Sequence, residues 1–487
     1  MGSPTRRGGL AALQSLLQEG LDHDHAQRYA EAARAYQAYL AQAPFHAEVW
    51  ADLGGVQRMA GAFEEAERAC RKALALKADL APAKVDLAHL LLRRQQPQEA
   101  EALCRQVLAR HPDHVPALTA LADALAQRGA LAEAQAVAER AWTLDPASAD
   151  ARSRFVHLSF RRRDLAALFR AEEPDYAKLP PELIPYERSL WHLLFGHFQE
   201  GWRGYEHRLL APGFIRSGAI PRGPRWLGES FEGRTLLLHW EQGLGDTLMC
   251  LRYLPWVKAL GGRVVLVVQP ALRDLAATCP GADEILPDGS PLPAYDLHTY
   301  LLSLPGLFLG RGVPDTIPYL GVPETVPHRA ELAAALGSAG EALRIGVVWG
   351  GNPAYRRDAE RSIPGALWGP LGDLPGLAWF GLQLDRPDAP PLPGLTDLGP
   401  HLGTFADTAF ALAHLDLLIS VDTSVAHLAG ALGVPTFLLL PYQPDWRWLL
   451  DRDDSPWYPH HRLYRQPLPG DWASVFRQIA RDLSGEG

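Results

Sequence analysis

Apolar and polar positions recur every 34 residues along the first part of the chain. The segments YAEA, FEEA, PQEA and LAEA begin at residues 29, 63, 97 and 131, and leucines keep the same spacing at Leu53, Leu87 and Leu121. Other positions in phase are small residues suited to helix crossings and glycines suited to turns: Gly54, Ala88, Ala122, Gly61 and Gly129. The period predicts one pair of helices in each repeat, stacked over residues 12–152.

These positions resemble the tetratricopeptide repeat family. One pair of helices cannot bury its apolar face alone, so stacked neighbours share a core and leave a concave groove. Leu165 falls a further 34 residues along, and FGHFQEGW at 195–202 resembles a turn that enters another second helix. We therefore assign residues 153–231 to a degenerate repeat and a linker.

The groove predicts a protein or glycan acceptor as the partner of the repeats, although a spacer or a dimerisation arm explains the repeats as well. The eukaryotic O-linked N-acetylglucosamine transferases also join such repeats to a sugar-transferring module, and a ladder of asparagines lines their groove. The present chain contains one asparagine, Asn352, which lies beyond the repeats. Its groove therefore cannot carry such a ladder.

The periodicity changes after a Pro- and Gly-rich joint at residues 211–226. Short apolar runs then alternate with helical stretches, in one series over residues 232–340 and a second over 341–487. The first strand leads into a predicted helix over about 246–260. Continuous apolar strands separated by helices indicate parallel sheets covered on both faces. Two such series predict two doubly wound, Rossmann-like α/β domains that face a cleft, with ligands beyond the carboxyl ends of the strands. The predicted strands are 235–240, 264–268, 284–286, 344–349, 379–384, 417–420 and 436–440.

The first candidate site follows the first of these strands. In EQGLGD, Gln242 precedes Gly243 and Gly245, which allow a tight turn and a close approach of the backbone to a ligand, and Asp246 begins a helix. A dinucleotide-binding fingerprint would need another glycine where Leu248 stands, so a nicotinamide or flavin enzyme is disfavoured. A plain strand-to-helix turn capped by Asp246 is the simpler alternative.

The second candidate site follows the strand at 344–349. A pair of glycines leads into Asn352 and a cluster of arginines at Arg356, Arg357 and Arg361. Arginine forks bind phosphate oxygens in a bidentate manner, and lysine is absent from this part of the sequence. A solvated loop of mixed charge is the alternative, because acidic residues lie within the same cluster.

The third candidate site follows the strand at 417–420. Asp422, Thr423 and Ser424 stand directly before the helix that carries His427. Hydroxyls and exposed amides at a helix N-terminus form an anion site suited to a diphosphate. A simple helix cap with His427 on the surface would explain these residue types, but it would not explain why three such sites share one face.

Composition narrows the class of protein. With 47% hydrophobic and 21% charged residues the chain reads as globular, and no window reaches the ~18 unbroken apolar residues of a membrane span. We expect a cytoplasmic protein. The net charge of −9 gives no field to attract a polyanion, so nucleic acid is not expected as a partner. Arginine outnumbers lysine by 42 to 5, and the last lysine is Lys258. The four cysteines show no metal-binding or CxxC spacing, which favours small buried residues in a reducing compartment.

The three sites together resemble a known family. GLGD, VWGGNP and SVDTSVAHLAGALGVPT are similar to motifs of the glycosyltransferase family that includes the bacterial ADP-heptose:lipopolysaccharide heptosyltransferases, which have the two-domain GT-B fold. The likeness covers roughly residues 232–485, and its third motif is the most specific. The whole arrangement resembles the bacterial tetratricopeptide proteins that carry a family-9-like glycosyltransferase module.

The resemblance implies an acceptor held by the first α/β domain and a nucleotide-sugar donor held by the second. It makes Asp246 the catalytic base and places the donor diphosphate at Asp422, Thr423 and His427. The family has a glycine where Ser424 stands. It also has a lysine at the donor phosphates, which Arg356 or Arg361 would replace here. The implied reaction is an inverting hexosyl or heptosyl transfer that needs neither a metal nor a cofactor.

Other readings of the same residues stay open. A catalytically inactive repeat scaffold that retains the fold would explain Ser424 and the missing lysine. A nucleotide-sugar epimerase shares the two-domain architecture. Asp451 and Asp453 have the spacing of a metal-binding pair, but they follow a helix-like segment and read as a solvated turn. Trp446 and Trp448 are candidates for stacking on a sugar or a base, although most tryptophans belong to a core.

Overall fold

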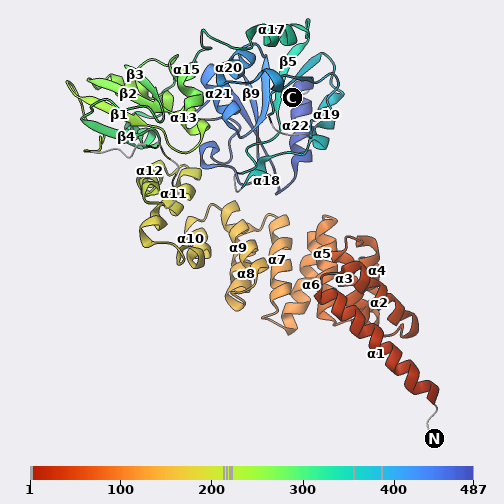
Figure 1. Cartoon of the computed structure of the whole chain (residues 1–487). Coiled ribbons are helices and arrows are strands. Elements are labelled where there is room, and N and C mark those ends of the chain that lie inside the picture. Colours follow the sequence, from red (N-terminus) through yellow and green to blue (C-terminus); the bar gives the residue numbers. More distant parts are fainter. Residues whose placement is uncertain are drawn as a thin grey trace. The chain divides into compact units, whose positions relative to one another are not determined.

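The computed structural model describes residues 4–211, 214, 216, 218, 223–354, 357–384 and 388–485. The chain forms two compact units, Met1–Lys178 and Leu179–Gly487. The first is helical, and the second combines a short helical segment with two parallel sheets (Figure 1).

The first unit consists of antiparallel helix pairs, as the 34-residue period predicts. The second helices of successive pairs begin at residues 29, 63, 97, 131 and 165, so the structural period is also 34. The helices are α1 (Pro4–His25), α2 (Tyr29–Gln42), α3 (Ala47–Met59), α4 (Phe63–Leu76), α5 (Ala81–Arg93), α6 (Pro97–Arg110), α7 (Val115–Gln127), α8 (Leu131–Leu144), α9 (Ala149–Arg161) and α10 (Leu165–Tyr176).

One residue in the turn of each helix pair has a left-handed backbone. These residues also lie 34 positions apart, and their φ angles are 56° at Gln27, 81° at Gly61, 59° at Gln95, 81° at Gly129 and 55° at Arg163. Glycine adopts this conformation without steric cost, whereas a side chain disfavours it. The turn geometry is therefore the same at Gln27, Gln95 and Arg163, where the residue is not glycine.

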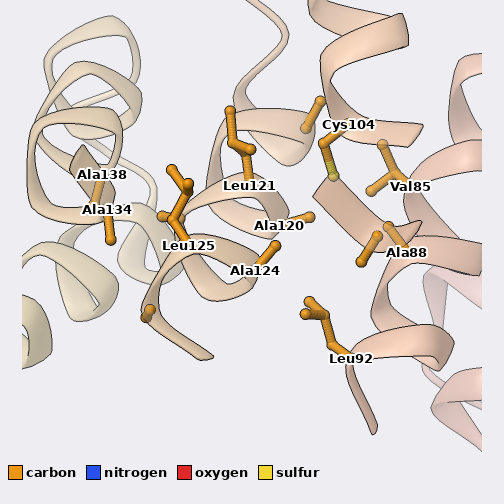
Figure 2. Packing of buried hydrophobic residues seen from close by; sticks show 14 of the residues in the cluster. Val85, Ala88, Leu92, Cys104, Ala120, Leu121, Ala124, Leu125, Ala134 and Ala138 are labelled. Atoms are coloured by element: carbon orange, nitrogen blue, oxygen red, sulfur yellow. The ribbon is translucent and has the colours of Figure 1, made fainter. Parts of the chain in front are cut away.

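Small residues let the helices of the first unit approach closely. A Cβ on Gly54 would lie 2.5 Å from Sγ of Cys70, so the glycine is required by the contact between α3 and α4. Further along, Ala88 of α5, Cys104 of α6 and Ala120 of α7 belong to one buried cluster (Figure 2). Each pair thus completes the core of its neighbour.

The second unit starts with helices. They are η1 (Pro181–Leu183), α11 (Ile184–Leu194), α12 (Phe198–Tyr205) and η2 (Glu206–Leu210). The turn between α11 and α12 again contains a left-handed residue, Gly196. A Cβ on Gly204 would lie 2.6 Å from the carbonyl oxygen of Pro185, so α12 packs directly on the start of α11.

The first sheet is parallel, with the order β3-β2-β1-β4 in the described residues. Its strands are β1 (Thr235–His239), β2 (Arg263–Val268), β3 (Glu284–Pro287) and β4 (Leu297–Tyr300). The helix predicted over 246–260 is interrupted, because Pro255 has no N–H to donate and its ring would clash with the preceding turn. The resulting helices are α13 (Leu244–Leu251) and α14 (Leu254–Lys258). Shorter elements follow: η3 (Pro270–Leu272), α15 (Arg273–Ala276), η4 (Leu301–Ser303), α16 (Leu304–Leu307), η5 (Leu309–Arg311) and α17 (Arg329–Gly337).

The second sheet is also parallel, with the order β10-β9-β8-β5-β6-β7 in the described residues. Its strands are β5 (Leu343–Val348), β6 (Leu377–Gly381), β7 (Thr396–Asp397), β8 (Leu417–Val421), β9 (Thr436–Leu440) and β10 (His461–Arg465). Its helices are α18 (Asp358–Arg361), η6 (Gly365–Trp368), α19 (Gly369–Gly372), η7 (Gly399–His401), α20 (Phe405–Leu412), α21 (Ser424–Leu432), η8 (Trp446–Trp448) and α22 (Trp472–Ser484). The prediction of parallel strands separated by helices is confirmed for this unit.

The cysteines are buried, and the prediction that they act as small core residues agrees with the structure. Burial is the main cause that raises the pKa of each thiol. The four buried cysteines are Cys70, Cys104, Cys250 and Cys279. Among the helices that the structure describes, none has both the length and the apolar character needed to cross a membrane.

Candidate functional site

The candidate residues lie in loops that follow parallel strands. Because such strands point the same way, the loops after β5, β8 and β9 share one edge of the second sheet, and the loop after β1 leaves the corresponding edge of the first. The strand order of the second sheet reverses between β5 and β8. This reversal is where parallel α/β sheets bind their ligands.

The two sheet regions meet through Gly245 and His427. Gly245 lies in the first turn of α13, and His427 lies in the first turn of α21. A Cβ on Gly245 would come within 2.6 Å of Cδ2 of His427. Glycine is therefore needed here for close packing, and the packing brings two helix N-termini together.

Asp246 is held between a backbone amide and an arginine. Its Oδ2 accepts the N–H of Gly243 at 2.8 Å, and its Oδ1 accepts a hydrogen bond from Nη2 of Arg447. Its side chain is 15% exposed. Burial raises the pKa of this carboxyl, while Arg447 and the Gly243 amide oppose the rise. The residue that caps α13 is Gly243, so Asp246 stands within the first turn and not at the cap position considered from sequence.

The helical segment of the second unit contributes to the same neighbourhood. Gln242 has a left-handed backbone with φ of 60°, and its Nε2 donates to the hydroxyl of Tyr205 at 3.0 Å. The rings of Trp202 and Trp446 meet edge to face, with centroids 5.2 Å apart. Helix α12 thus supports both the glycine loop and the segment after β9.

The residues after β8 form an open helix N-terminus. Thr423 caps α21 with an extended backbone and makes no side-chain capping hydrogen bond to the described residues, and Ser424 is the first helical residue. The amides of a first turn have no acceptor within their own helix. The hydroxyls of Ser420 and Thr423 are 3.5 Å apart. The anion site expected from sequence at this helix terminus stays a prediction.

Asp422 is a buried carboxyl with a raised pKa. Burial, followed by the charge of Asp445, raises its pKa to about 6, and the charges of Arg361 and Arg447 act in the opposite direction. Its Oδ1 lies 3.9 Å from Nε2 of His427. The pKa of Asp422 therefore lies above that of an ordinary carboxyl.

His427 is buried, contrary to the alternative that places it on the surface. Its Nδ1 and the hydroxyl of Tyr458 share a hydrogen bond of 2.9 Å, and its ring stacks on Trp448 with centroids 5.4 Å apart. Burial, with a further contribution from Arg447, lowers the pKa of His427 well below the usual value. The imidazole is therefore neutral and serves to join α21 to the aromatic residues after β9.

The loop after β5 meets the site through Arg361. Nη1 of Arg361 donates to the carbonyl oxygen of Asp422 at 2.7 Å, and its Nε donates to Asp358 at 3.1 Å. Asn352 is exposed, and its Oδ1 accepts the N–H of Ala354 at 2.9 Å, which stabilises its own turn. Arg356 lies outside the described residues.

Sequence reasoning missed two charged residues after β9. Nη1 of Arg447 donates to Oδ1 of Asp445 at 2.7 Å, in addition to the bond with Asp246. The Arg447 side chain is 9% exposed, and its guanidinium carbon lies 4.2 Å from the centroid of the Trp446 ring. The sequence PDWRWLL, residues 444–450, was interpreted as a helix-like segment with aromatic residues. Their place directly after an apolar strand of the same sheet was the signal that put them at this edge.

The site thus combines a carboxylate, the N-terminus of a helix and a buried guanidinium. The charge of Arg447 interacts with the charges of three acidic side chains, Asp246, Asp422 and Asp445. Within the described part of the chain, no group of three or more His, Cys, Asp or Glu residues is placed to hold a metal ion. The chemistry this arrangement supports is proton removal beside a bound anion.

The repeats also carry a cavity of about 560 Å³ among α2, α3 and α4. Leu40, Trp50 and Leu53 form part of its apolar lining, and Lys72 adds a positive charge. Gln57 also lines it and is 6% exposed, and its Oε1 has no hydrogen-bond partner among the described residues. The cavity is therefore suited to an apolar group that brings a hydrogen-bond donor.

Family comparisons identify the helical repeats. Models of the tetratricopeptide repeat match residues 17–81, 57–125 and 91–153. Residues 17–153 are therefore tetratricopeptide repeats, as the sequence predicts. Arrays of this kind present extended surfaces that bind other proteins.

One curated relative extends beyond the repeats. The protein FlbA of Caulobacter vibrioides is 28% identical over 366 residues, which cover 67% of this chain and 60% of FlbA. The aligned part is longer than residues 1–178, so the likeness reaches into the second unit. The chain spans less than two thirds of the length of that relative.

Solved structures resemble the repeats at low scores. MamA is 17% identical with a TM-score of 0.30, covering 34% of this chain and 94% of MamA. A tetratricopeptide repeat protein from Parabacteroides merdae is 18% identical with a TM-score of 0.32, covering 42% of this chain and 81% of that protein. The protein TTC0263 of Thermus thermophilus is 17% identical with a TM-score of 0.31, covering 33% and 89% of the two chains.

Proposed function

We propose that residues 232–485 form a glycosyltransferase module of the GT-B type, which transfers a sugar from a nucleotide-sugar donor to an acceptor hydroxyl. The observation that carries the proposal is the placement of Asp246 against the N-terminus of α21 through the contact of Gly245 with His427. A carboxylate and an anion-binding helix terminus then lie at one junction between two parallel sheets.

In this proposal Asp246 is the general base. Its carboxylate takes the proton of the acceptor hydroxyl while the oxygen forms a bond to the anomeric carbon of the sugar. The bond from that carbon to the phosphate oxygen breaks, and its electron pair leaves with the nucleotide. Attack from the opposite face inverts the anomeric carbon.

Negative charge on the leaving nucleotide is stabilised by the chain itself. In this proposal the first-turn amides of α21 at Thr423 and Ser424 and the positive end of the helix dipole would face the leaving diphosphate. Such fixed dipoles act without reorganisation when charge develops. The proposed reaction therefore proceeds without a metal or cofactor as an electrophile.

The repeats belong to the proposal as the part that recruits a protein or glycan acceptor. Their identity as tetratricopeptide repeats supports this role, and the cavity among α2, α3 and α4 offers a place for a side chain of the acceptor. The proposed location of the reaction is the cytoplasm.

A donor panel tests the proposed function. The full-length protein is titrated with UDP, GDP, ADP and CMP, and the matching nucleotide sugars are incubated with it, first alone and then with cell extract as a source of acceptor. We expect one nucleotide to bind and its sugar to be transferred only when acceptor is present. Asp246→Asn should keep the fold but lose turnover. Absence of binding to every nucleotide and nucleotide sugar would refute the proposal.

A repeat scaffold without catalysis is the second candidate. It is supported by the ion pair of Asp246 with Arg447, which engages the carboxylate of the proposed base, and by Ser424 in place of glycine. A scaffold would keep its cellular role when Asp246 is changed to Asn. An enzyme would lose that role together with turnover.

A further inference from the structure

The site contains few cations that can meet a phosphate. Sequence analysis assigned this task to Arg356 or Arg361, because no lysine follows Lys258. Two arginines in the described part of the site contact its acidic residues. Arg361 donates to the carbonyl oxygen of Asp422, and Arg447 donates to the carboxylate of Asp246. The contacts of these two arginines indicate which of them is able to bind a phosphate.

Arg361 is committed to the loop after β5. Its Nε and Nη1 bond to Asp358 and to the carbonyl oxygen of Asp422, respectively. A Cβ on Gly351 would lie 2.4 Å from its Nη2, so the backbone of Gly351 packs directly against the guanidinium. Arg361 therefore fixes the loop and the end of β8 relative to each other.

Arg447 is held differently. Its two terminal nitrogens bond to carboxylates, Asp246 and Asp445, whereas its Nε is buried and has no hydrogen-bond partner among the described residues. A buried N–H of a charged group without an acceptor is costly, and such groups are normally satisfied. The guanidinium also acts electrostatically on Asp422 and His427, the residues at the start of α21.

We propose, building on the proposed function, that Arg447 binds the donor phosphates together with the N-terminus of α21, and that this binding releases Asp246. A phosphate offers Arg447 a bidentate acceptor and offers the first-turn amides of α21 a negative charge. The phosphate then accepts a hydrogen bond from Nε of Arg447 and takes the place of the Asp246 carboxylate beside the guanidinium. The N–H of Gly243 continues to hold Asp246 in place.

The exchange makes Asp246 a base that depends on the donor. Without donor, the carboxylate is neutralised by Arg447, so it is a poor acceptor of a proton. With donor bound, the positive charge is shared with the phosphates, and the carboxylate is left in a buried setting that favours protonation. The acceptor hydroxyl would therefore be activated only when a sugar is ready to receive it.

Binding of inorganic pyrophosphate to the full-length protein tests this inference. Because Asp246 competes with the anion for Arg447, Asp246→Asn should bind pyrophosphate about tenfold more tightly than the wild type, and Arg447→Gln about tenfold more weakly. The double variant should bind as weakly as Arg447→Gln. Arg477→Gln, which removes an exposed arginine of α22, is the control and should bind like the wild type.

The signs of these changes decide the outcome. Tighter binding by Asp246→Asn, as measured by titration calorimetry, supports competition, and unchanged or weaker binding overturns it. Arg447→Gln leaves two acidic side chains without their cation, so its fold is checked by circular dichroism, and the Asp246→Asn result stands without it. Pyrophosphate carries neither sugar nor base. If the variants show these changes in pyrophosphate affinity but the protein transfers no sugar, only the proposed glycosyltransferase activity is refuted. If the protein transfers sugar but the variants do not show these changes, only the proposed exchange of Asp246 for phosphate on Arg447 is refuted.

Discussion

The α-carbon of Gly245 faces the imidazole of His427 so closely that a Cβ would lie 2.6 Å from Cδ2. This contact joins the helix after β1 to the helix after β8. It therefore sets the distance between the proposed base, Asp246, and the helix terminus at Thr423.

Gly245→Ala should separate these helices. The added methyl group meets a ring that is fixed by Tyr458 and Trp448, so we expect a loss of ~1–3 kcal/mol in the free energy of unfolding, together with loss of nucleotide binding. Urea denaturation and nucleotide titration measure the two effects. Gly310→Ala is the matched control, because a Cβ there has no heavy atom within 4 Å. Equal stability of the two variants would contradict the close contact.

Arg208 and Glu241 form a buried ion pair that anchors η2 to the end of β1. The guanidinium donates to both carboxylate oxygens at 2.9 and 2.7 Å, and both side chains are 0% exposed. Arg208→Met leaves a buried charge without its partner and should cost about 3–5 kcal/mol of unfolding free energy. Adding Glu241→Leu should recover most of that loss in chemical denaturation. A double variant no more stable than the single one would show that the pair itself is not the cause.

The turn residues of the repeats predict a stabilising substitution. Gln95 has a left-handed backbone at the position that glycine occupies in the repeat before it and in the repeat after it, at Gly61 and Gly129. Gln95→Gly should raise the stability of the first unit by about 1 kcal/mol, and Gly129→Gln should lower it by a similar amount. Thermal denaturation of the two variants should therefore show opposite shifts. Shifts in the same direction would mean that the side chains matter more than the backbone.

Asp422 predicts a dependence of stability on pH. Its pKa is about 6 in the folded protein against an ordinary 3.8, so ionisation is disfavoured by folding. The penalty is absent below pH 3.8, grows as the pH rises towards 6, and is complete above it. Asp422→Asn should then stabilise the protein by ~3 kcal/mol at pH 8 and by almost nothing at pH 4. Denaturation at the two pH values measures this, with the exposed Asp373→Asn as the control. A gain that is the same at both values would contradict the raised pKa.

The repeats could be predicted because each 34-residue unit restates the same local pattern. The central strands were equally clear, since β2, β8 and β9 are nearly continuous apolar runs. The edge strands β4 and β10 were missed. They include polar residues such as Thr299, Arg462 and Arg465, which interrupt the apolar run by which a strand is recognised in the sequence.

The site was predicted only where a motif is local. Asp246 and His427 stand in recognisable motifs at the start of helices, and the structure brings them to one junction. Arg447 lies in the short helix η8 and Asp445 caps it, but the role of Arg447 depends on a contact with a residue 201 positions away in sequence. Tyr205 reaches the glycine loop from a helix, a relationship that no spacing within either segment encodes.

The buried pair of Arg208 and Glu241 has a consequence for how such a chain can evolve. It makes α11 and α12 part of the unit that holds Asp246, although their helical hairpin is built like the repeats. Recombination that adds or removes 34-residue repeats before residue 179 would leave this unit whole. The same event one hairpin later would strip Glu241 of its counter-ion, so the last hairpin should be inherited with the sheets.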